Sequence, residues 1–222
     1  MRVIAIDGPA GSGKTSVARA VADRLGMEYL DTGAMYRAVT FAVLRVGGDP
    51  ADNGFSAKVA RAIDLRVERD QVFVDGVDAT VEIRGRSVNR AVSLVAANPD
   101  VRSEMVARQR EWVRRCGGGV LEGRDIGTVV FPDAAVKVYL TAAPAVRALR
   151  RARQDGLADA PNPPDGGPEA AGVETVAADL ARRDMIDSTR RAGPLTVAPD
   201  ALVIDTTDKT FDETIEQILE LV

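Results

Sequence analysis

The 222-residue sequence contains no histidine and a single cysteine, Cys116. Without histidine, the protein has no imidazole that could serve as a general base, a nucleophile or a zinc ligand. A single cysteine excludes an internal disulfide and is typical of a reducing compartment. We therefore expect a cytoplasmic protein whose chemistry needs neither group.

The sequence also lacks any apolar run near the roughly 20 residues that a membrane helix needs. Its first residues lead directly into a predicted strand and a glycine-rich loop, without the pattern of a secretory signal. The net charge is −4, from 33 acidic and 29 basic residues, whereas nucleic-acid-binding proteins usually present a strongly basic face. We therefore expect no membrane partner and no nucleic-acid partner, and we expect a monomer.

Apolar periodicity predicts an alternating order of strands and helices at the start of the chain. A buried strand over residues 3–6 precedes a glycine loop, a helix over 17–25 and a second strand over 28–31. Another helix begins at Thr32, a residue suited to an N-cap, and ends near Gly47. This order is typical of an α/β protein with a doubly wound parallel sheet.

Residues 63–78 interrupt this order, because apolar and charged residues alternate there around two turn signals. The alternation predicts a small antiparallel meander inserted into the α/β core. Beyond a turn region that contains Ser93, a helix follows Pro99. Three more predicted strands, over 120–122, 136–140 and 201–204, bring the parallel sheet to five.

A capping box opens the predicted closing helix at Thr210, and the pattern places Phe211 on its buried face.

Residues 154–172 are rich in proline and glycine and contain few apolar residues. They could form a passive linker, but arginines cluster on both sides, which favours a functional lid over bound substrate. We therefore divide the chain into a core of residues 1–40, 98–153 and 173–222, an inserted monophosphate-binding domain of about 41–97, and a lid of about 154–172.

The glycine loop carries the full pattern G-x-x-x-x-G-K-[ST], placed between a strand and a helix as a phosphate-binding P-loop requires. Its glycines let backbone N–H groups converge on phosphate oxygens. We expect Lys14 to reach the β and γ phosphates of ATP and the Thr15 hydroxyl to hold Mg²⁺. The predicted ATP-binding residues of this segment are Gly8, Pro9, Ala10, Gly11, Ser12, Gly13, Lys14, Thr15 and Ser16.

A P-loop leaves three classes of protein open: a small-molecule kinase, a switch GTPase, and an ATPase that drives a partner. The sequence lacks the Asn-Lys-x-Asp motif of guanine-reading GTPases. It also lacks a four-residue apolar strand that ends in a lone aspartate for Mg²⁺, as motor ATPases usually have. A kinase also agrees with the missing histidine, since phosphoryl transfer depends mostly on positioning and on charge neutralisation.

The whole chain closely resembles bacterial cytidylate kinases, which belong to the nucleoside monophosphate kinases. The resemblance runs from the string Ile4–Pro9 through Gly123–Ala134 to Pro194-Leu195, and Gly123–Ala134 is its most specific part. It implies a P-loop NTPase-type five-stranded parallel sheet flanked by helices, with an inserted monophosphate-binding domain and a short lid. It also implies transfer of the γ-phosphoryl group of ATP, with Mg²⁺, to CMP or dCMP.

The resemblance assigns a role to each matching residue. The phosphate-binding arginines of the family correspond to Arg37, Arg124 and Arg190, and its cytosine contacts to Ser93, Arg102 and Asp125. The ribose contacts correspond to Arg183 and Asp187, and Thr32 stands where the family has a small hydroxyl residue near the acceptor. The implied catalytic residues are Lys14, Arg124, Asp125, Arg183 and Arg190.

Some of these assignments have alternatives. Arg147 and Arg151 resemble the paired lid arginines that contact ATP in nucleoside monophosphate kinases, but they could equally form a solvated basic helix face. Asp125 could be a structural acid that pairs with Arg124. For the whole chain, a P-loop kinase for another small metabolite and a nucleotide-binding regulator without turnover both remain open.

Overall fold

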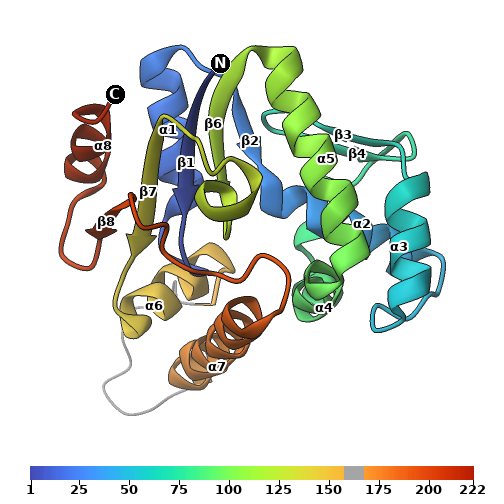
Figure 1. Ribbon diagram of the computed structural model, residues 1–222. Coiled ribbons are helices and arrows are strands. Elements are labelled where there is room, and N and C mark those ends of the chain that lie inside the picture. Colours follow the sequence, from blue (N-terminus) through green and yellow to red (C-terminus); the bar gives the residue numbers. More distant parts are fainter. Residues whose placement is uncertain (158–167) are drawn as a thin grey trace.

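The computed structural model describes residues 1–157 and 168–222, so the central part of the predicted lid lies outside the described residues. A five-stranded sheet forms the centre of the molecule (Figure 1). Its strands pair in the order β2 (Tyr29–Asp31), β6 (Gly118–Gly123), β1 (Arg2–Asp7), β7 (Val136–Thr141) and β8 (Leu202–Asp205). Every pairing is parallel, which confirms the predicted fold class.

Helices pack against the faces of this sheet and against one another (Figure 1). They are α1 (Lys14–Leu25), α2 (Thr32–Arg45), α3 (Asn53–Ala62), α4 (Arg86–Ala97), α5 (Pro99–Cys116), α6 (Pro144–Gln154), α7 (Pro168–Thr189) and α8 (Phe211–Leu219). Within residues 1–157 and 168–222, no helix is both long enough and apolar enough to cross a membrane.

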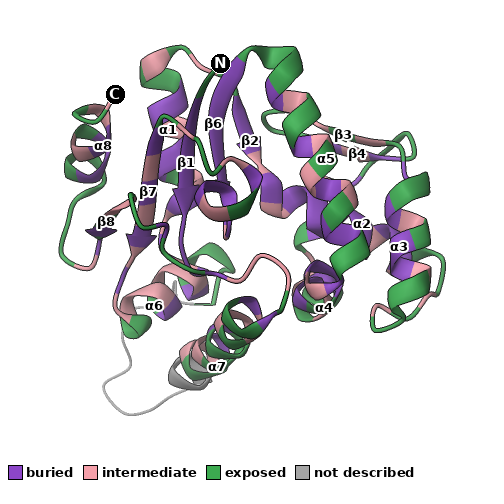
Figure 2. Ribbon diagram, viewed as in Figure 1, coloured by how far each residue is buried: buried purple, intermediate pink, exposed green. Residues whose placement is uncertain are grey.

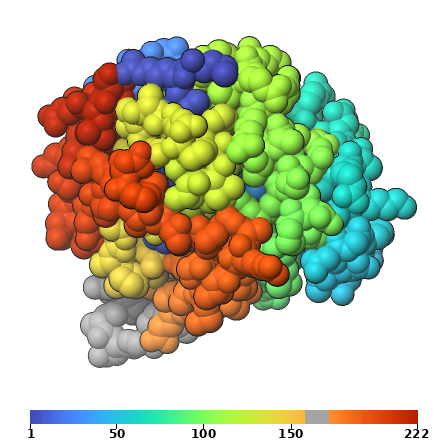
Figure 3. All heavy atoms as spheres, viewed as in Figure 1, coloured from blue at the N-terminus to red at the C-terminus, as the bar shows by residue number. Residues whose placement is uncertain are grey.

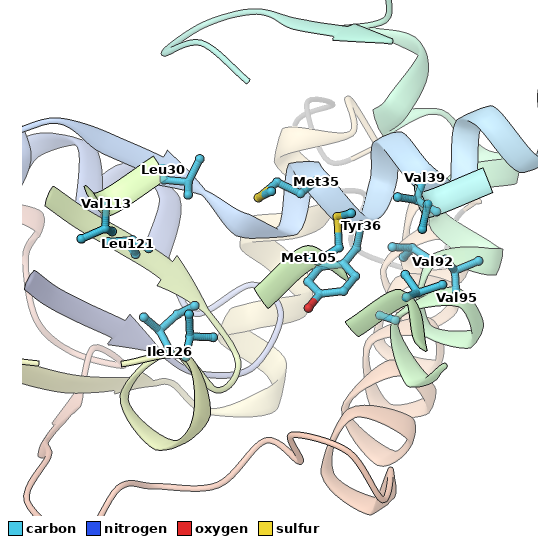
Figure 4. Packing of buried hydrophobic residues seen from close by; sticks show 14 of the residues in the cluster. Leu30, Met35, Tyr36, Val39, Val92, Val95, Met105, Val113, Leu121 and Ile126 are labelled. Carbon is cyan, nitrogen blue, oxygen red and sulfur yellow. The ribbon is translucent and has the colours of Figure 1, made fainter. Parts of the chain in front are cut away.

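Two apolar clusters cover the two faces of the sheet, and the central strands β1 and β6 between them are buried (Figure 2). One cluster joins β1 and β7 to α1 and α8, through residues such as Ile6, Val21 and Ile215. The other joins β6 to α2, α4 and α5, and Met105 and Tyr36 pack together at its centre (Figure 4). This burial fixes the ends of β1 and β6, from which the functional segments extend.

A separate antiparallel sheet of β3 (Leu65–Val67), β4 (Val72–Val74) and β5 (Val77–Asp78) forms the predicted meander. The sequence analysis missed the two helices on either side of it, α3 and α4. Ser93, expected in a turn region, lies within α4 and is buried. The apolar residues of α4 face α2 and α5, and this packing stabilises a helix that has no side-chain cap.

Two smaller expectations are wrong. The N-cap of α2 is Asp31, whose side chain accepts from the Ala34 amide at 2.9 Å, and Thr32 is the first residue of the helix. At the other end of the chain, the capping box at Thr210 is present, but Phe211 is 49% exposed instead of buried. Phe211 lies one turn before the buried Ile215, at the N-terminal end of α8.

After β6 the chain forms a π-helical turn, η2 (Ile126–Val130). The carbonyl oxygen of Asp125 accepts from the amides of Val129 (2.9 Å) and Val130 (3.2 Å). The side chain of Ile126 reaches into the core (Figure 4) and is almost fully buried. The segment Gly123–Ala134, which carries the family resemblance, therefore contains a wide turn at the carboxyl end of the sheet, and the side chain of Ile126 anchors this turn in the core.

Candidate active site

A pocket of about 530 Å³ lies at the carboxyl ends of the parallel strands, where open α/β sheets bind their ligands. It extends from the P-loop to the segment that follows β6 and to the facing sides of α2, α4, α5 and α7. The predicted site residues that line it are Ala10, Gly11, Ser12, Gly13, Lys14, Thr15, Ser16, Thr32, Arg37, Ser93, Arg102, Arg124, Asp125, Arg151, Arg183, Asp187 and Arg190. Gly8, Pro9 and Arg147 do not line it.

The P-loop connects β1 to the N-terminus of α1, so the positive end of the helix faces the pocket. Gly8 must be glycine, because a Cβ there would collide with the carbonyl oxygen of Leu140. Lys14 is buried at the start of α1, and its ammonium donates to the carbonyl oxygen of Pro9 at 2.7 Å. Burial, and then the nearby guanidinium of Arg124, lowers the pKa of Lys14 below its usual value. An anion in the pocket would therefore favour the charged form of Lys14.

Glu122, at the end of β6, is a functional candidate that the sequence analysis missed. Its carboxylate is buried, accepts from the hydroxyl of Tyr29 at 2.7 Å, and lies close to Lys14 and to the hydroxyl of Thr15. Burial, and then the charge of Asp31, raises the pKa of Glu122. Glu122 does not fit the pattern of an aspartate after four apolar residues, because it is a glutamate in a strand that begins with two glycines.

The two arginines predicted to contact ATP have different surroundings. Arg147 lies behind the P-loop, where it donates to the carbonyl oxygen of Ala10 at 3.0 Å and pairs with Asp184. Asp184 in turn accepts from the amide of Ala10 at 3.1 Å, so the pair holds the loop by its backbone. Arg151 lines the pocket, and its Nε lies 2.9 Å from Asp155. Arg150, which the sequence analysis did not select, also lines it.

Buried arginines from distant parts of the chain meet across the middle of the pocket. Arg37 of α2 donates to the carbonyl oxygen of Ile83 (3.0 Å) and to Asn89 Oδ1 (2.6 Å). Burial, and then the charge of Arg183, lowers the pKa of Arg37 to about 9. Burial, and then Arg124, lowers that of Arg183 to about 10. Among the described residues, the Nε of Arg183 has no hydrogen-bond partner. These cations repel one another, so an anion between them would be stabilised.

Asp125 and Arg102, which both line the pocket, form a buried ion pair. Both side chains are about 95% buried, and Arg190 Nη2 lies 3.7 Å from the other oxygen of Asp125. Burial raises the pKa of Asp125, and the two arginines oppose this effect. Gly193 passes directly against the pair, and a Cβ there would collide with both partners.

Arg124 pairs with Asp187 of α7 instead of with its neighbour Asp125, and its Nε lies 2.9 Å from Asp187 Oδ2. Burial disfavours the charge of Arg124, but this carboxylate raises its pKa. Asp187 also lies 3.5 Å from Arg190 Nη1. The structural alternative for Asp125, pairing with Arg124, is therefore wrong.

The remaining predicted acceptor contacts lie around this group. The hydroxyl of Thr32 donates to the carbonyl oxygen of Glu122 at 2.5 Å, and Ser93 lines the pocket from α4. Other lining residues that were not selected include Arg84, which pairs with Asp31 at 3.2 Å, and Tyr36, whose ring lies 5.5 Å from the guanidinium carbon of Arg102. Arg84 stands in no recognisable motif, whereas Tyr36 directly precedes the predicted phosphate-binding residue Arg37.

Comparison with known proteins agrees with this geometry. The family model described as "Cytidylate kinase" matches residues 4–222. This chain belongs to the cytidylate kinase family. A cytidylate kinase from Mycolicibacterium paratuberculosis is 49% identical over 227 residues, which cover 99% of this chain and 94% of that protein. A cytidylate kinase from Mycobacterium avium is 48% identical with the same coverage.

A solved structure also resembles this member of the cytidylate kinase family. It is an uncharacterized protein from Eubacterium ventriosum, with a TM-score of 0.51 and 11% sequence identity. The match covers 99% of this chain and 97% of that chain. At this low identity the likeness concerns the fold alone.

Proposed function

We propose that the pocket carries out the reaction of the cytidylate kinase family, in which the γ-phosphoryl group of ATP is transferred to CMP to give CDP and ADP. A single observation carries this proposal. One continuous pocket joins a P-loop to several buried arginines and to a carboxylate–guanidinium pair. The P-loop end suits a triphosphate, the arginines suit the phosphoryl group in transit, and the pair suits the edge of a base.

At the donor end, the P-loop amides and Lys14 bind the phosphates of ATP. Arg124, Arg183 and Arg190 stabilise the charge that spreads over the migrating phosphoryl group. An oxygen of the CMP phosphate attacks the γ-phosphorus, and ADP leaves. Because Arg124 and Arg190 are already held by Asp187, these two cations need little reorganisation during the reaction.

At the acceptor end, Arg37 binds the phosphate of CMP, and Ser93, Arg102 and Asp125 contact cytosine. The Asp125 carboxylate accepts from the exocyclic amino group of cytosine, and Arg102 donates to its ring acceptors. Arg183 and Asp187 contact the ribose, and Thr32 lies near the acceptor.

The residues around Thr15 fit a Mg²⁺ ion that arrives with ATP. A hydroxyl and a buried carboxylate, Thr15 and Glu122, lie together beside the P-loop lysine, and both offer the oxygen ligands that Mg²⁺ prefers. Within the described part of the chain, no group of three or more acidic, histidine or cysteine residues could hold a metal alone. When bound, the ion neutralises charge on the β and γ phosphates.

A coupled assay of ADP release across a panel of acceptors tests the proposal. At saturating MgATP we expect turnover with CMP and dCMP, weak turnover with UMP, and none with AMP, GMP or shikimate. Release of ADP with another metabolite but not with CMP would indicate a P-loop kinase of different specificity. Binding of ATP without turnover of any acceptor would indicate a regulator.

The role of Asp187 at the sugar predicts an unequal effect on CMP and dCMP. Asp187→Ala removes a carboxylate that lies one helical turn from Arg183, where the two can bridge ribose hydroxyls. We expect kcat/KM to fall more for CMP than for dCMP, because only CMP has a 2′-hydroxyl to lose as a partner. Steady-state kinetics with both acceptors measure the difference.

Asp184→Ala serves as the control for this prediction. Asp184 lies on the same helix and also pairs with an arginine, but it contacts the P-loop. The Asp184→Ala variant should alter the KM for ATP and leave the ratio of kcat/KM for CMP to that for dCMP unchanged. An equal loss of kcat/KM for both acceptors in Asp187→Ala would show that Asp187 does not contact the 2′-hydroxyl.

The remaining proposals concern the whole protein. We propose a cytoplasmic monomer that binds neither nucleic acid nor membranes, in keeping with a net charge of −4 and a single free cysteine. Size-exclusion chromatography with light scattering tests the monomer. The division into core, inserted domain and lid also stays a proposal.

A further inference from the structure

We propose that Asp7 and Arg110 are positioning residues that hold the turn η2 from its two ends and thereby fix Asp125 against the acceptor base. The inference rests on the proposed function, because it assumes that Asp125 reads the base. Neither Asp7 nor Arg110 lines the active-site pocket. Each therefore acts on the base through the turn.

Asp7 holds the N-terminal end of the turn. Its two carboxylate oxygens accept from the amides of Ile126 and Gly127, each at 2.8 Å. These are the two residues that follow Asp125, and their amides are among those that a helical turn leaves unpaired. Asp7 is only 5% exposed, and burial raises its pKa to about 6 while the two amides oppose this rise. It is also the last residue of β1, so it ties the turn to the strand that carries the P-loop.

Arg110 of α5 holds the C-terminal end. Its Nε donates to the carbonyl oxygen of Val130 and its Nη2 to that of Val129, each at 3.0 Å. A cation is favourable at this end, where helical carbonyl groups lack partners. Figure 3 shows the atoms that follow β6 (yellow) directly against those of α5 (green).

The same helix also reaches Asp125. Arg102 lies eight residues before Arg110, about two turns of helix, and forms the buried pair with the Asp125 carboxylate. Helix α5 therefore contacts Asp125 directly and the far end of its turn through Arg110. Because the carbonyl oxygen of Asp125 is itself the acceptor for two amides of η2, a shift of the turn moves Asp125 as well.

Substitution of Arg110 provides the test. Arg110→Met keeps an apolar stem and removes the guanidinium, and Arg110 is exposed, so the fold should survive. At saturating MgATP we expect kcat/KM for CMP to fall about tenfold, since a small misplacement of a binding group can cost this much. UMP, which Asp125 does not favour, should change little, and the KM for ATP should stay unchanged.

Arg108→Met is a matched control. Arg108 lies on the same helix, and its guanidinium also donates to backbone carbonyls, those of Ile63 (3.0 Å) and Ala60 (3.1 Å). These belong to α3 and the residue after it, away from η2. The control should therefore leave the CMP:UMP ratio as it is in the wild type. If Arg110→Met leaves the ratio unchanged, or Arg108→Met narrows it equally, the positioning role is wrong.

Asp7→Asn tests the other end of the turn. The asparagine side chain retains one oxygen that can accept from the amide of Ile126 or Gly127. Its NH₂ group faces the other amide, and two donors repel each other. We expect the CMP:UMP ratio to narrow as in Arg110→Met. If Asp7→Asn fails to fold, Arg110→Met still decides the proposal.

The reference variant is Asp125→Asn. If it leaves the ratio unchanged, the proposed role of Asp125 fails. If it narrows the ratio while Arg110→Met does not, only the positioning role fails.

Discussion

Lys14→Ala is expected to lower kcat at least ~100-fold, comparable to the loss of one preorganised donor to a developing anion. Lys14 neutralises charge that grows on the bridge between the β and γ phosphates in the transition state. The loss should therefore appear in kcat far more than in the KM for CMP. Steady-state kinetics with ATP and CMP, each varied at saturation of the other, measure the two effects separately.

The Lys14 variant should remain folded, which makes this result interpretable. Burial lowers the pKa of Lys14 to about 7, so the substitution removes an ammonium that is costly to bury. The melting temperature of the variant checks this point. Lys58→Ala, on the exposed surface of α3, is the control and should leave kcat unchanged. A kcat near that of the wild type in folded Lys14→Ala would contradict the role given to Lys14.

Asp125→Ala should lower kcat/KM for CMP steeply while changing that for UMP much less. Cytosine offers an amino group at C4, from which a carboxylate accepts, whereas uracil presents a carbonyl oxygen that the carboxylate repels. A site built around one hydrogen bond discriminates strongly, since each unsatisfied buried group costs about 1–3 kcal/mol. We expect the CMP:UMP ratio to narrow about tenfold or more, since 1.4 kcal/mol corresponds to a factor of ten. The measurement is kcat/KM for both acceptors at saturating MgATP.

Removal of the Asp125 charge also has a structural cost. A second variant distinguishes this cost from the loss of base recognition. Asp125→Ala leaves Arg102 and Arg190 buried without their shared carboxylate, which can destabilise the protein. Asp125→Asn keeps the shape and can donate to the uracil carbonyl, so we expect it to narrow the ratio at least as much. A CMP:UMP ratio that survives both substitutions would show that Asp125 holds the arginines and does not read the base.

Much of the site could be predicted because its signals are local in the chain. The P-loop binds through consecutive backbone amides, so its pattern predicts its geometry directly. The same holds for the capping box at Thr210, which is set by residues three apart. The arginines received their individual roles only through the family resemblance, since no local pattern says which group of a substrate Arg37 or Arg183 would bind.

The expectations that failed depend on packing between distant segments. Ser93 was placed in a turn region because α4 lacks a capping signal and is stabilised by α2 and α5. Phe211 was placed in the core because its spacing fits the apolar face of α8, yet it is about half exposed and lines the active-site pocket. Periodicity predicts which face of a helix is apolar, but it does not predict how much of that face is covered.

The sequence by itself determined the alternation of strands and helices in the core, the P-loop and the family. The first two follow from patterns of neighbouring residues, and the family follows from similarity along the whole sequence. Only the tertiary structure decided the ion pairs. Arg124 pairs with Asp187, 63 residues away, and Asp125 with Arg102, 23 residues away, although Arg124 and Asp125 are neighbours in sequence. It also brought Asp7 and Arg110 to the two ends of η2. These partners are selected by burial, because a charge removed from water requires whichever opposite charge or backbone dipole the fold brings into reach.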